Sequence, residues 1–144
     1  MRDATKNLPA IDLTTALAFS EGSFVFPNPW QRAIGRCREN GLAVCRLSFG
    51  VSPIRDRIYV DGVEVAQAHR RQGYGTALLL EVAKFCSPQR PLLPITALNE
   101  VWASNEFWNA LRDSKGHGLT VTRDVRVGEM EVESARWCRL IPLD

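Results

Sequence analysis

Long hydrophobic runs are missing from this chain of 144 residues. No apolar stretch approaches the roughly 18 residues that a membrane-spanning helix needs, so we expect no transmembrane segment. Residues 1–7 also lack the apolar centre of a secretory signal peptide. Both absences indicate a cytoplasmic protein that does not act on a membrane.

A strong excess of charge of either sign is missing as well. The chain has 18 lysines and arginines against 16 aspartates and glutamates, a formal net charge of +2, which is too small to indicate nucleic-acid binding by itself. Arg32 and Arg36 are four residues apart and would share one side of a helix, but Arg38 would point to the opposite side. Nucleic acid is therefore disfavoured as a partner.

The cysteines lack the spacing of the common metal motifs. Cys37, Cys45, Cys86 and Cys138 are far apart, with no Cys-x-x-Cys pair and no pair of histidines nearby. Zinc sites are usually built from such closely spaced ligands. We expect four reduced thiols, as in a cytosolic protein, and no metal site.

Repeats and low-complexity segments are also missing, and the composition is that of an ordinary globular protein. Hydrophobic residues make up 45% of the chain and charged residues 24%, both typical values for a folded domain. The length suits one domain over residues 1–144, with residues 1–9 frayed.

What the chain does contain is a glycine turn between a strand-like run and an apolar helical run. Residues 58–65 favour a strand, residues 70–75 read RRQGYG, and an apolar helical pattern continues over residues 76–86. Glycine permits a tight turn, and a helix that begins there presents unpaired N–H groups at its positive end. With two arginines beside it, the turn predicts an anion site suited to phosphate or pyrophosphate.

Two well-known phosphate loops do not fit this turn. A P-loop needs a lysine after its last glycine, whereas Thr76 follows Gly75. A dinucleotide-binding turn needs a third small residue where Leu78 stands. An ordinary β–α turn with two solvated arginines remains as the plain alternative.

The turn resembles motif A of the GNAT superfamily of N-acetyltransferases, which reads Arg/Gln-x-x-Gly-x-Gly/Ala. That family places a hydrophobic strand end eight residues before the first glycine, and Val65 stands there. Residues 103–111 are similar, more loosely, to the helix after the family's fifth strand. The resemblance covers about residues 58–111. It implies a layered α/β fold, the GNAT-like acyl-CoA N-acyltransferase fold, with a mixed central sheet and helices on both faces.

Local patterns predict the remaining elements. We expect helices over residues 11–19, 29–40, 76–86 and 103–111. We expect strands over residues 42–49, 57–66 and 95–98, and a closing hairpin of residues 119–126 and 130–143 with its turn at 127–128. Asn28 and Pro29 would begin the second helix, and Gly41 would follow its end. The family's first strand has no clear place, and residues 23–26 are one position for it.

The resemblance implies that acetyl-CoA is the co-substrate and that its acetyl group moves to an amine. The pyrophosphate would lie on the N–H groups of the turn, where a Cβ at Gly73 would be pushed toward the phosphates. The amide-rich pantetheine arm would pair like an added strand with the backbone of residues 63–65. The implied CoA-binding residues are Val63, Glu64, Val65, Arg70, Arg71, Gln72, Gly73, Tyr74, Gly75, Thr76, Asn105 and Trp108.

The attacking amine must lose a proton, so a general base or a water relay is useful. Tyr59 stands where some family members carry a glutamate base. Asp61 lies two residues on, hence on the same face of the strand, and is the first candidate. Glu64 would point to the other face unless a bulge intervenes. His69 has a pKa suited to the role, although a packing or surface role is the commoner one.

The leaving thiolate must gain a proton, and many family members use a tyrosine for this step. Trp108 stands at that position, and an indole N–H is no acid. Water or Tyr59 would then supply the proton. The asparagine that often precedes this helix is also replaced, by Val101, with Asn105 close by. A CoA-binding or regulatory module without catalysis therefore remains as an alternative.

The acceptor is defined least well, as an amine of a small molecule or of a protein. Phe24, Phe26 and Trp30 either pack N-terminal helices on the sheet or line an acceptor pocket. The strand expected over residues 130–143 is long and apolar enough to join two copies in a homodimer, unless it is covered within one chain.

Overall fold

The computed structural model describes most of the chain. The described residues are 8–17, 30–88, 91–98, 105–114, 118–123, 125, 126, 129, 132, 133, 135 and 136. Across these ranges, no helix combines the length and the apolar character that crossing a membrane requires.

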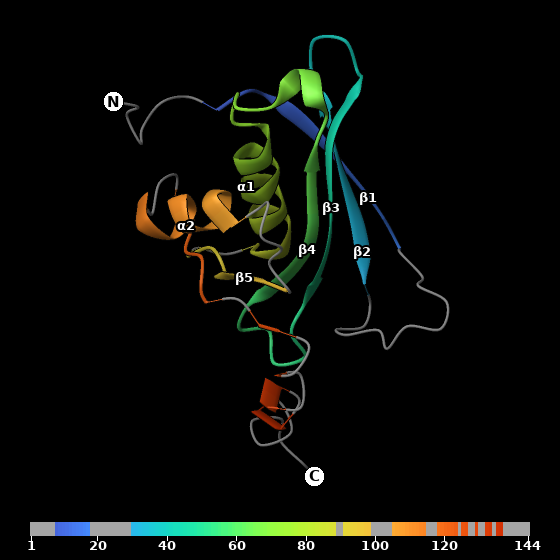
Figure 1. Ribbon diagram of the computed structural model, residues 1–144. Helices are drawn as coiled ribbons and strands as arrows, with labels where there is room; N and C mark the ends of the chain where they lie inside the picture. The colour runs from blue at the N-terminus through green and yellow to red at the C-terminus, as the bar shows by residue number, and fades with distance from the viewer. Residues whose placement is uncertain are drawn as a thin grey trace.

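A five-stranded mixed sheet forms the centre of the fold (Figure 1). The strands lie in the order β1-β2-β3-β4-β5, antiparallel from β1 to β4, and β5 runs parallel to β4. Their bounds are Ile11–Leu17, Gln31–Cys37, Ala43–Val51, Ile58–Val65 and Ile95–Ala97. The expected α/β class with a mixed sheet is confirmed, and β3, β4 and β5 occupy the predicted strand positions.

The two longest described helices, α1 and α2, lie on one face of this sheet (Figure 1). Helix α1 (Tyr74–Cys86) packs across β1 to β4. Helix α2 (Asn105–Ser114) adds Trp108 and Leu111 to the same core. The helices predicted over residues 76–86 and 103–111 are thus present. The two others are strands over their described residues.

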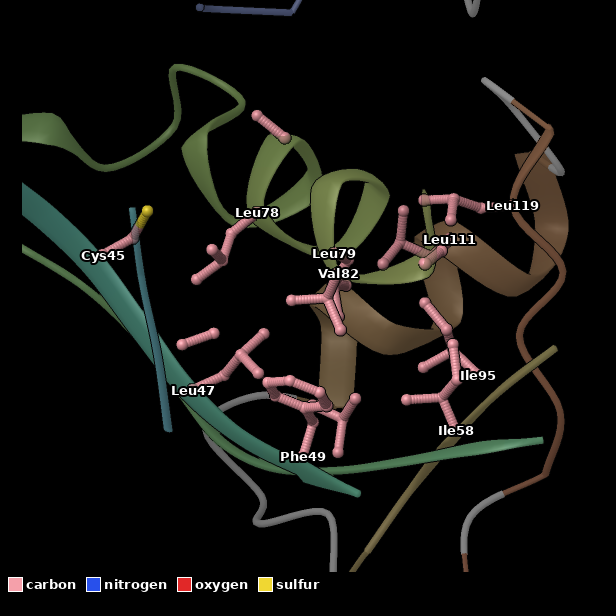
Figure 2. Close-up of a cluster of buried hydrophobic side chains, with 14 of the residues drawn as sticks. Cys45, Leu47, Phe49, Ile58, Leu78, Leu79, Val82, Ile95, Leu111 and Leu119 are labelled. Carbon is pink, nitrogen blue, oxygen red and sulfur yellow. The ribbon is translucent and has the colours of Figure 1, made fainter. Parts of the chain in front are cut away.

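Helix α1 follows from its own sequence. Its interior contains good helix formers and no proline. The buried positions form one face of the helix and are Gly75, Ala77, Leu78, Leu79, Val82 and Ala83. Figure 2 shows Leu78, Leu79 and Val82 packed over Leu47 and Phe49 of β3. Complete burial of each such leucine or valine contributes roughly 1.5–3 kcal/mol, so this contact fixes α1 on the sheet.

The helices predicted over residues 11–19 and 29–40 are wrong. The described residues of both segments form strands, along which the exposure of the side chains alternates with a period of two. Strand β2 buries Ala33, Gly35 and Cys37 and turns Arg32 and Arg36 outward. That alternation suits a strand with one face on the core. Strand β1 pairs with β2 along its whole length and supplies the first strand that the sequence left without a place.

The chain reverses between β2 and β3 in a tight turn. Gly41 has a φ of +72°, and its N–H donates to the Cys37 carbonyl at 2.7 Å. It therefore belongs to a hairpin rather than to the end of a helix. Residues 23–26 and the predicted helix start at Asn28 and Pro29 lie outside the described residues.

The predicted closing hairpin is also wrong where the structure describes it. Val121 and Val125 make isolated parallel bridges to Ile95 and Leu98. Residues 132, 133, 135 and 136 are helical rather than extended. Helical spacing places Glu133 and Arg136 on one side, where both contact Tyr59. The predicted turn at residues 127–128 lies outside the described residues, and the homodimer stays a prediction.

Candidate functional site

Strand β5 pairs with β4 over a short stretch, and β4 extends beyond the end of β5. The paired positions are Ile58 with Ile95, Tyr59 with Thr96 and Val60 with Ala97. The last contact is the hydrogen bond from the Leu98 N–H to the Val60 carbonyl, at 2.8 Å. Beyond Val60, β4 continues to Val65 with no β5 partner among the described residues. Figure 1 shows β4 continuing past the end of β5, so within the described part of the chain one edge of β4 is open beyond Val60.

A β-bulge lies at the point where this open edge begins. Ser48 of β3 pairs with Asp61 and Arg46 pairs with Glu64, so β4 uses three residues where β3 uses two. Gly62 sits in the bulge with a φ of +66°, a conformation that glycine adopts at little cost.

The bulge changes which side chains share a face. Val63 and Val65 pack against the core beneath the helices, while Glu64 pairs on the opposite face with Arg46. In a regular strand Glu64 would point away from the face that carries Tyr59 and Asp61. The bulge instead brings Asp61 and Glu64 to the same face, the one that the helices leave uncovered.

The glycine turn joins the open edge to helix α1. After the short 3₁₀ helix η1 (Gln67–His69), Arg71 has a φ of +63° and Gly73 a φ of +90°. Gly73 is the N-cap of α1, and no side chain caps the helix. The first helical bond runs from the Ala77 N–H to the Gly73 carbonyl, at 2.9 Å. The N–H groups of the first turn therefore have no acceptor within the helix, as an anion site requires.

A pocket of about 1000 Å³ joins these features. It extends from the start of α1 along the end of β4, and Phe107 of α2 lines it as well. Most of the predicted CoA-binding residues line this pocket, namely Val63, Glu64, Val65, Arg70, Arg71, Gly73, Tyr74, Gly75 and Thr76. Gln72 does not line it, and its side chain donates instead to the Ala68 carbonyl at 3.3 Å.

Helix α2 presents a different residue to the pocket from the one the sequence suggested. Trp108 is only 4% exposed and packs in the core, so it does not line the pocket. Phe107, its neighbour, does, because successive helical residues point about 100° apart. The sequence holds no signal that would have singled out Phe107, because two adjacent aromatics differ only in how α2 packs. Asn105 begins α2, and its side chain lies outside the described part.

A Cβ at each of the two glycines of the turn would meet a different part of the protein. A Cβ on Gly75 would lie 3.1 Å from Cε1 of Phe107 and 3.6 Å from Cγ2 of Val65, so its absence lets α2 close on α1. A Cβ on Gly73 would instead meet Cδ of Pro9 at 3.2 Å and Cδ2 of Leu8 at 3.3 Å. A Cβ at Gly73 would therefore meet the N-terminal segment first, and its effect on bound phosphates stays a prediction.

Arg70 holds the turn in place, and Arg71 adds positive charge to the pocket. Arg70 donates from Nε to the Val65 carbonyl at 3.1 Å and so ties the turn to the end of β4. Arg71 lines the pocket. His69 also lines it and contacts the Tyr74 ring edge-on at 5.5 Å between centroids. Its buried Nδ1 has no hydrogen-bond partner in the described structure.

The candidate catalytic groups differ in their surroundings. Asp61 is exposed at its outer surface, yet desolvation by neighbouring protein raises its pKa against the opposing hydrogen bond from the Gly62 N–H. Glu64 accepts two hydrogen bonds from Arg46, at 3.2 and 2.9 Å. Tyr59 is fully buried, and its hydroxyl donates to Glu133. Asp61 is thus the candidate base whose carboxylate holds no side-chain partner among the described residues.

Cysteine and metal chemistry find no support at this site. Cys45 lines the pocket, but burial raises its pKa to about 11 despite the Gly35 carbonyl nearby, so it remains a thiol. It lies against the core, as Figure 2 shows. The described residues contain no group of three or more His, Cys, Asp or Glu side chains placed to hold a metal ion.

Comparison with known proteins gives one family. The acetyltransferase (GNAT) family matches residues 20–115 of the 144. No curated protein matches the sequence.

Three solved structures are among those similar to this chain. A candidate acetyltransferase from Deinococcus radiodurans R1 is 18% identical with a TM-score of 0.45, over 74% of this chain and 85% of that one. A nourseothricin acetyltransferase is 18% identical with a TM-score of 0.47, over 77% and 74%. A ribosomal-protein-alanine N-acetyltransferase from Brucella melitensis biovar Abortus 2308 is 12% identical with a TM-score of 0.38, over 94% of both chains. At these values, nothing about substrate passes from them to this chain.

Proposed function

We propose that this chain, which belongs to the GNAT family of acetyltransferases, transfers the acetyl group of acetyl-CoA to an amine. The observation that carries the proposal is one continuous pocket. It joins the N–H groups at the start of α1 to the stretch of β4 that β5 leaves unpaired. Such a pocket suits a ligand with a pyrophosphate at one end and an amide-rich arm beyond it.

The pyrophosphate suits the glycine turn. The first-turn N–H groups of Tyr74, Gly75 and Thr76 have no acceptor within the helix, and Arg71 lines the pocket beside them. The pantetheine amides would pair with the backbone of β4 between Val63 and Val65, as an added strand does.

Bound acetyl-CoA would supply the thioester carbonyl carbon that the acceptor nitrogen attacks. A C–N bond forms, the C–S bond breaks, the amine gives one proton to a base, and the departing thiolate takes up a proton. Asp61 is the base that we propose first, because it lies beside the bulge on the open face. Glu64 comes second, since Arg46 already holds its carboxylate. We propose water as the proton donor, because the Tyr59 hydroxyl is bound to Glu133.

The second candidate function is a CoA-binding module without catalysis. Two observations favour it, namely the burial of Trp108 in the core and the engagement of the Tyr59 hydroxyl away from the pocket. Neither side chain is left as a proton donor for the thiolate. Under either function we place the protein in the cytoplasm, where its described cysteines Cys37, Cys45 and Cys86, all free thiols, would stay reduced.

Calorimetric titration of acetyl-CoA into three forms of the protein tests both functions. Thr76 lies in the first turn of α1 and lines the pocket. A Thr76→Asp carboxylate suits a helix start but repels a pyrophosphate, so we expect acetyl-CoA binding to weaken at least tenfold in a protein that still folds. Thr76→Asn, nearly the same size without the charge, is the control and should bind far better.

Thiol release in the presence of amines then separates the two functions. Binding to the wild type, loss with Thr76→Asp and release of CoA thiol with an amine support the acetyltransferase. Binding without thiol release for any amine supports the non-catalytic module. A folded wild type that does not bind acetyl-CoA would contradict both.

A further inference from the structure

The face of the sheet opposite the helices carries exposed polar side chains. Helices α1 and α2 lie on the other face (Figure 1). The outward side chains Arg32, Arg46, Asp61 and Glu64 are all exposed. This face meets the pocket at the open edge of β4, because Ile34, Arg46 and Glu64 are among the pocket residues.

Cross-strand pairing arranges these side chains in two rows that run from β1 to β4. The first row is Ala16, Arg32, Ser48 and Asp61, and the second is Thr14, Ile34, Arg46 and Glu64. Neighbouring strands lie about 4.8 Å apart, so the Cα atoms of Arg32 and Asp61 are roughly 10 Å apart. An arginine thus stands two strands from the candidate base, in the same row.

Arg32 is a positive charge on this face of the sheet that the described residues leave without a partner. It is exposed and makes no hydrogen bond or ion pair with any described residue. Arg46 in the second row binds Glu64, but both side chains of this pair are largely exposed, at 59% and 63%. Exposed pairs contribute at most about 1 kcal/mol, so a ligand anion can compete for Arg46.

We propose that the acceptor is an amine whose molecule also carries a carboxylate or a phosphate. Its amine would lie beside Asp61 at the bulge, and its anionic group would bind Arg32, with Arg46 on the adjacent row. This inference rests on the proposed acetyltransferase function of the same pocket. A second ammonium group, as in a polyamine, would meet guanidinium groups instead and be repelled.

Matched pairs of acceptors test the proposal with the full-length protein. The pairs are β-alanine against β-alaninamide, 4-aminobutyrate against 4-aminobutanamide, and phosphoethanolamine against ethanolamine. Rates of CoA thiol release give kcat and KM for each. We expect at least one anionic member to have a kcat/KM roughly tenfold or more above its neutral partner, as a charge-assisted hydrogen bond provides. Carboxylate and phosphate acceptors are compared directly, which separates the two anion sources.

Two variants locate the effect. Arg32→Gln should raise KM about tenfold for the anionic acceptor, leave kcat nearly unchanged and leave the neutral partner unaffected. Arg36→Gln removes the same charge from the same strand and the same face, but farther from Asp61. It should change neither acceptor. Both arginines are exposed, so both variants are expected to fold, which circular dichroism would check.

Each outcome decides the matter. Preference for anionic acceptors that disappears in Arg32→Gln and persists in Arg36→Gln supports the proposal. Equal or better use of the neutral partners overturns it and leaves the acetyltransferase function standing. Equal loss in both variants assigns the preference to general charge and overturns the Arg32 site. Binding of acetyl-CoA without transfer to any amine overturns the function together with the acceptor.

Discussion

The hydroxyl of Tyr59 donates a 2.6 Å hydrogen bond to Oε2 of Glu133, a residue 74 positions later in the chain. Tyr59 is fully buried, and the Glu133 side chain is only 12% exposed. Arg136 donates to the same Glu133 oxygen at 2.8 Å and to Asp56 at 2.6 Å. This cluster fastens the C-terminal segment to the start of β4.

Glu133→Ala should lower the free energy of unfolding by about 2–4 kcal/mol. The change removes the shared acceptor of the Tyr59 hydroxyl, Arg57 and Arg136. Asp56 still pairs with both arginines, but loss of a buried acceptor that serves three donors is costly. Urea unfolding followed by fluorescence measures it. Glu129→Ala is the control, because the Glu129 side chain pairs with Arg123 and accepts from the Arg126 N–H at exposed positions, and its removal should change stability little. A Glu133 variant as stable as this control would show that the cluster does not fasten the segment.

Protonation of Asp56 should lower the stability of the protein in acid. Partial burial alone would raise its pKa, but hydrogen bonds from Ser52 and Arg136 and the nearby arginine charges lower the pKa below its ordinary 3.8. A carboxyl with a lowered pKa stabilises the fold above pH 3.8, and this stability is lost as the pH falls through the lowered pKa. Asp56→Asn should therefore be less stable at pH 7 and vary less with pH below 3.8. Melting temperatures from pH 7 to pH 2 would show equal slopes if the idea is wrong.

Asp61→Asn should reduce activity and leave the fold intact or slightly more stable. A general base contributes about 100-fold or more to the rate. The pKa of Asp61 is raised by desolvation, so its ionised form is unfavourable in the folded state, and this cost grows as the pH rises above the ordinary pKa. Steady-state rates and melting at pH 7 measure both effects. Glu64→Gln, on the same face, should reduce the rate much less. The reverse ranking would make Glu64 the base.

Gly35→Ala should destabilise the sheet by about 1–3 kcal/mol, as overpacking of a core does. A Cβ at Gly35 would lie 2.6 Å from Sγ of Cys45 and 3.1 Å from Cδ1 of Ile11. Removing the sulfur should recover part of the loss, so the double variant Gly35→Ala/Cys45→Ala is expected to lose less than the sum of its single changes. Urea unfolding of all three variants forms the cycle, and simple additivity would contradict the contact.

Gly73→Ala should destabilise more than Gly41→Ala. Both glycines have positive φ, which costs an alanine roughly 1–2 kcal/mol. Around Gly41 there is open space, whereas a Cβ at Gly73 meets Pro9 and Leu8. The difference between the two free energies of unfolding therefore measures the contact with the N-terminal segment. Equal values would mean that this segment does not press on the turn.

Short sequence patterns predicted the part of the site whose residues follow one another in the chain. The run from β4 through the glycine turn into α1 is continuous in sequence, and its glycines, arginines and apolar helix follow one another directly. The open face of the sheet and the β-bulge depend instead on how β4 pairs with β3. Gly62 becomes a bulge only because Asp61 and Glu64 pair with positions two apart on β3, and sequence alone contains no register.

The errors have the same cause. Residues 11–17 and 31–37 are short and mixed in character, so helix and strand compete on nearly equal terms until β1 and β2 pair with each other. Glu133 and Arg136 are helical and bind Tyr59 and Asp56. These contacts outweigh the strand preference of their own segment. Phe107 and Trp108 show the same limit, because which of two adjacent aromatics is buried depends on where α2 packs.

The open edge of β4 also bears on whether copies of this protein aggregate. An unpaired strand edge is the place where a strand from another molecule can add, which is how sheets aggregate. Here the bulge at Gly62 breaks the regular spacing that an incoming strand would need, and the charged side chains of Asp61 and Glu64 flank it. The irregularity in the pairing of β3 with β4 therefore protects the edge against the wrong occupant while leaving it open to a ligand.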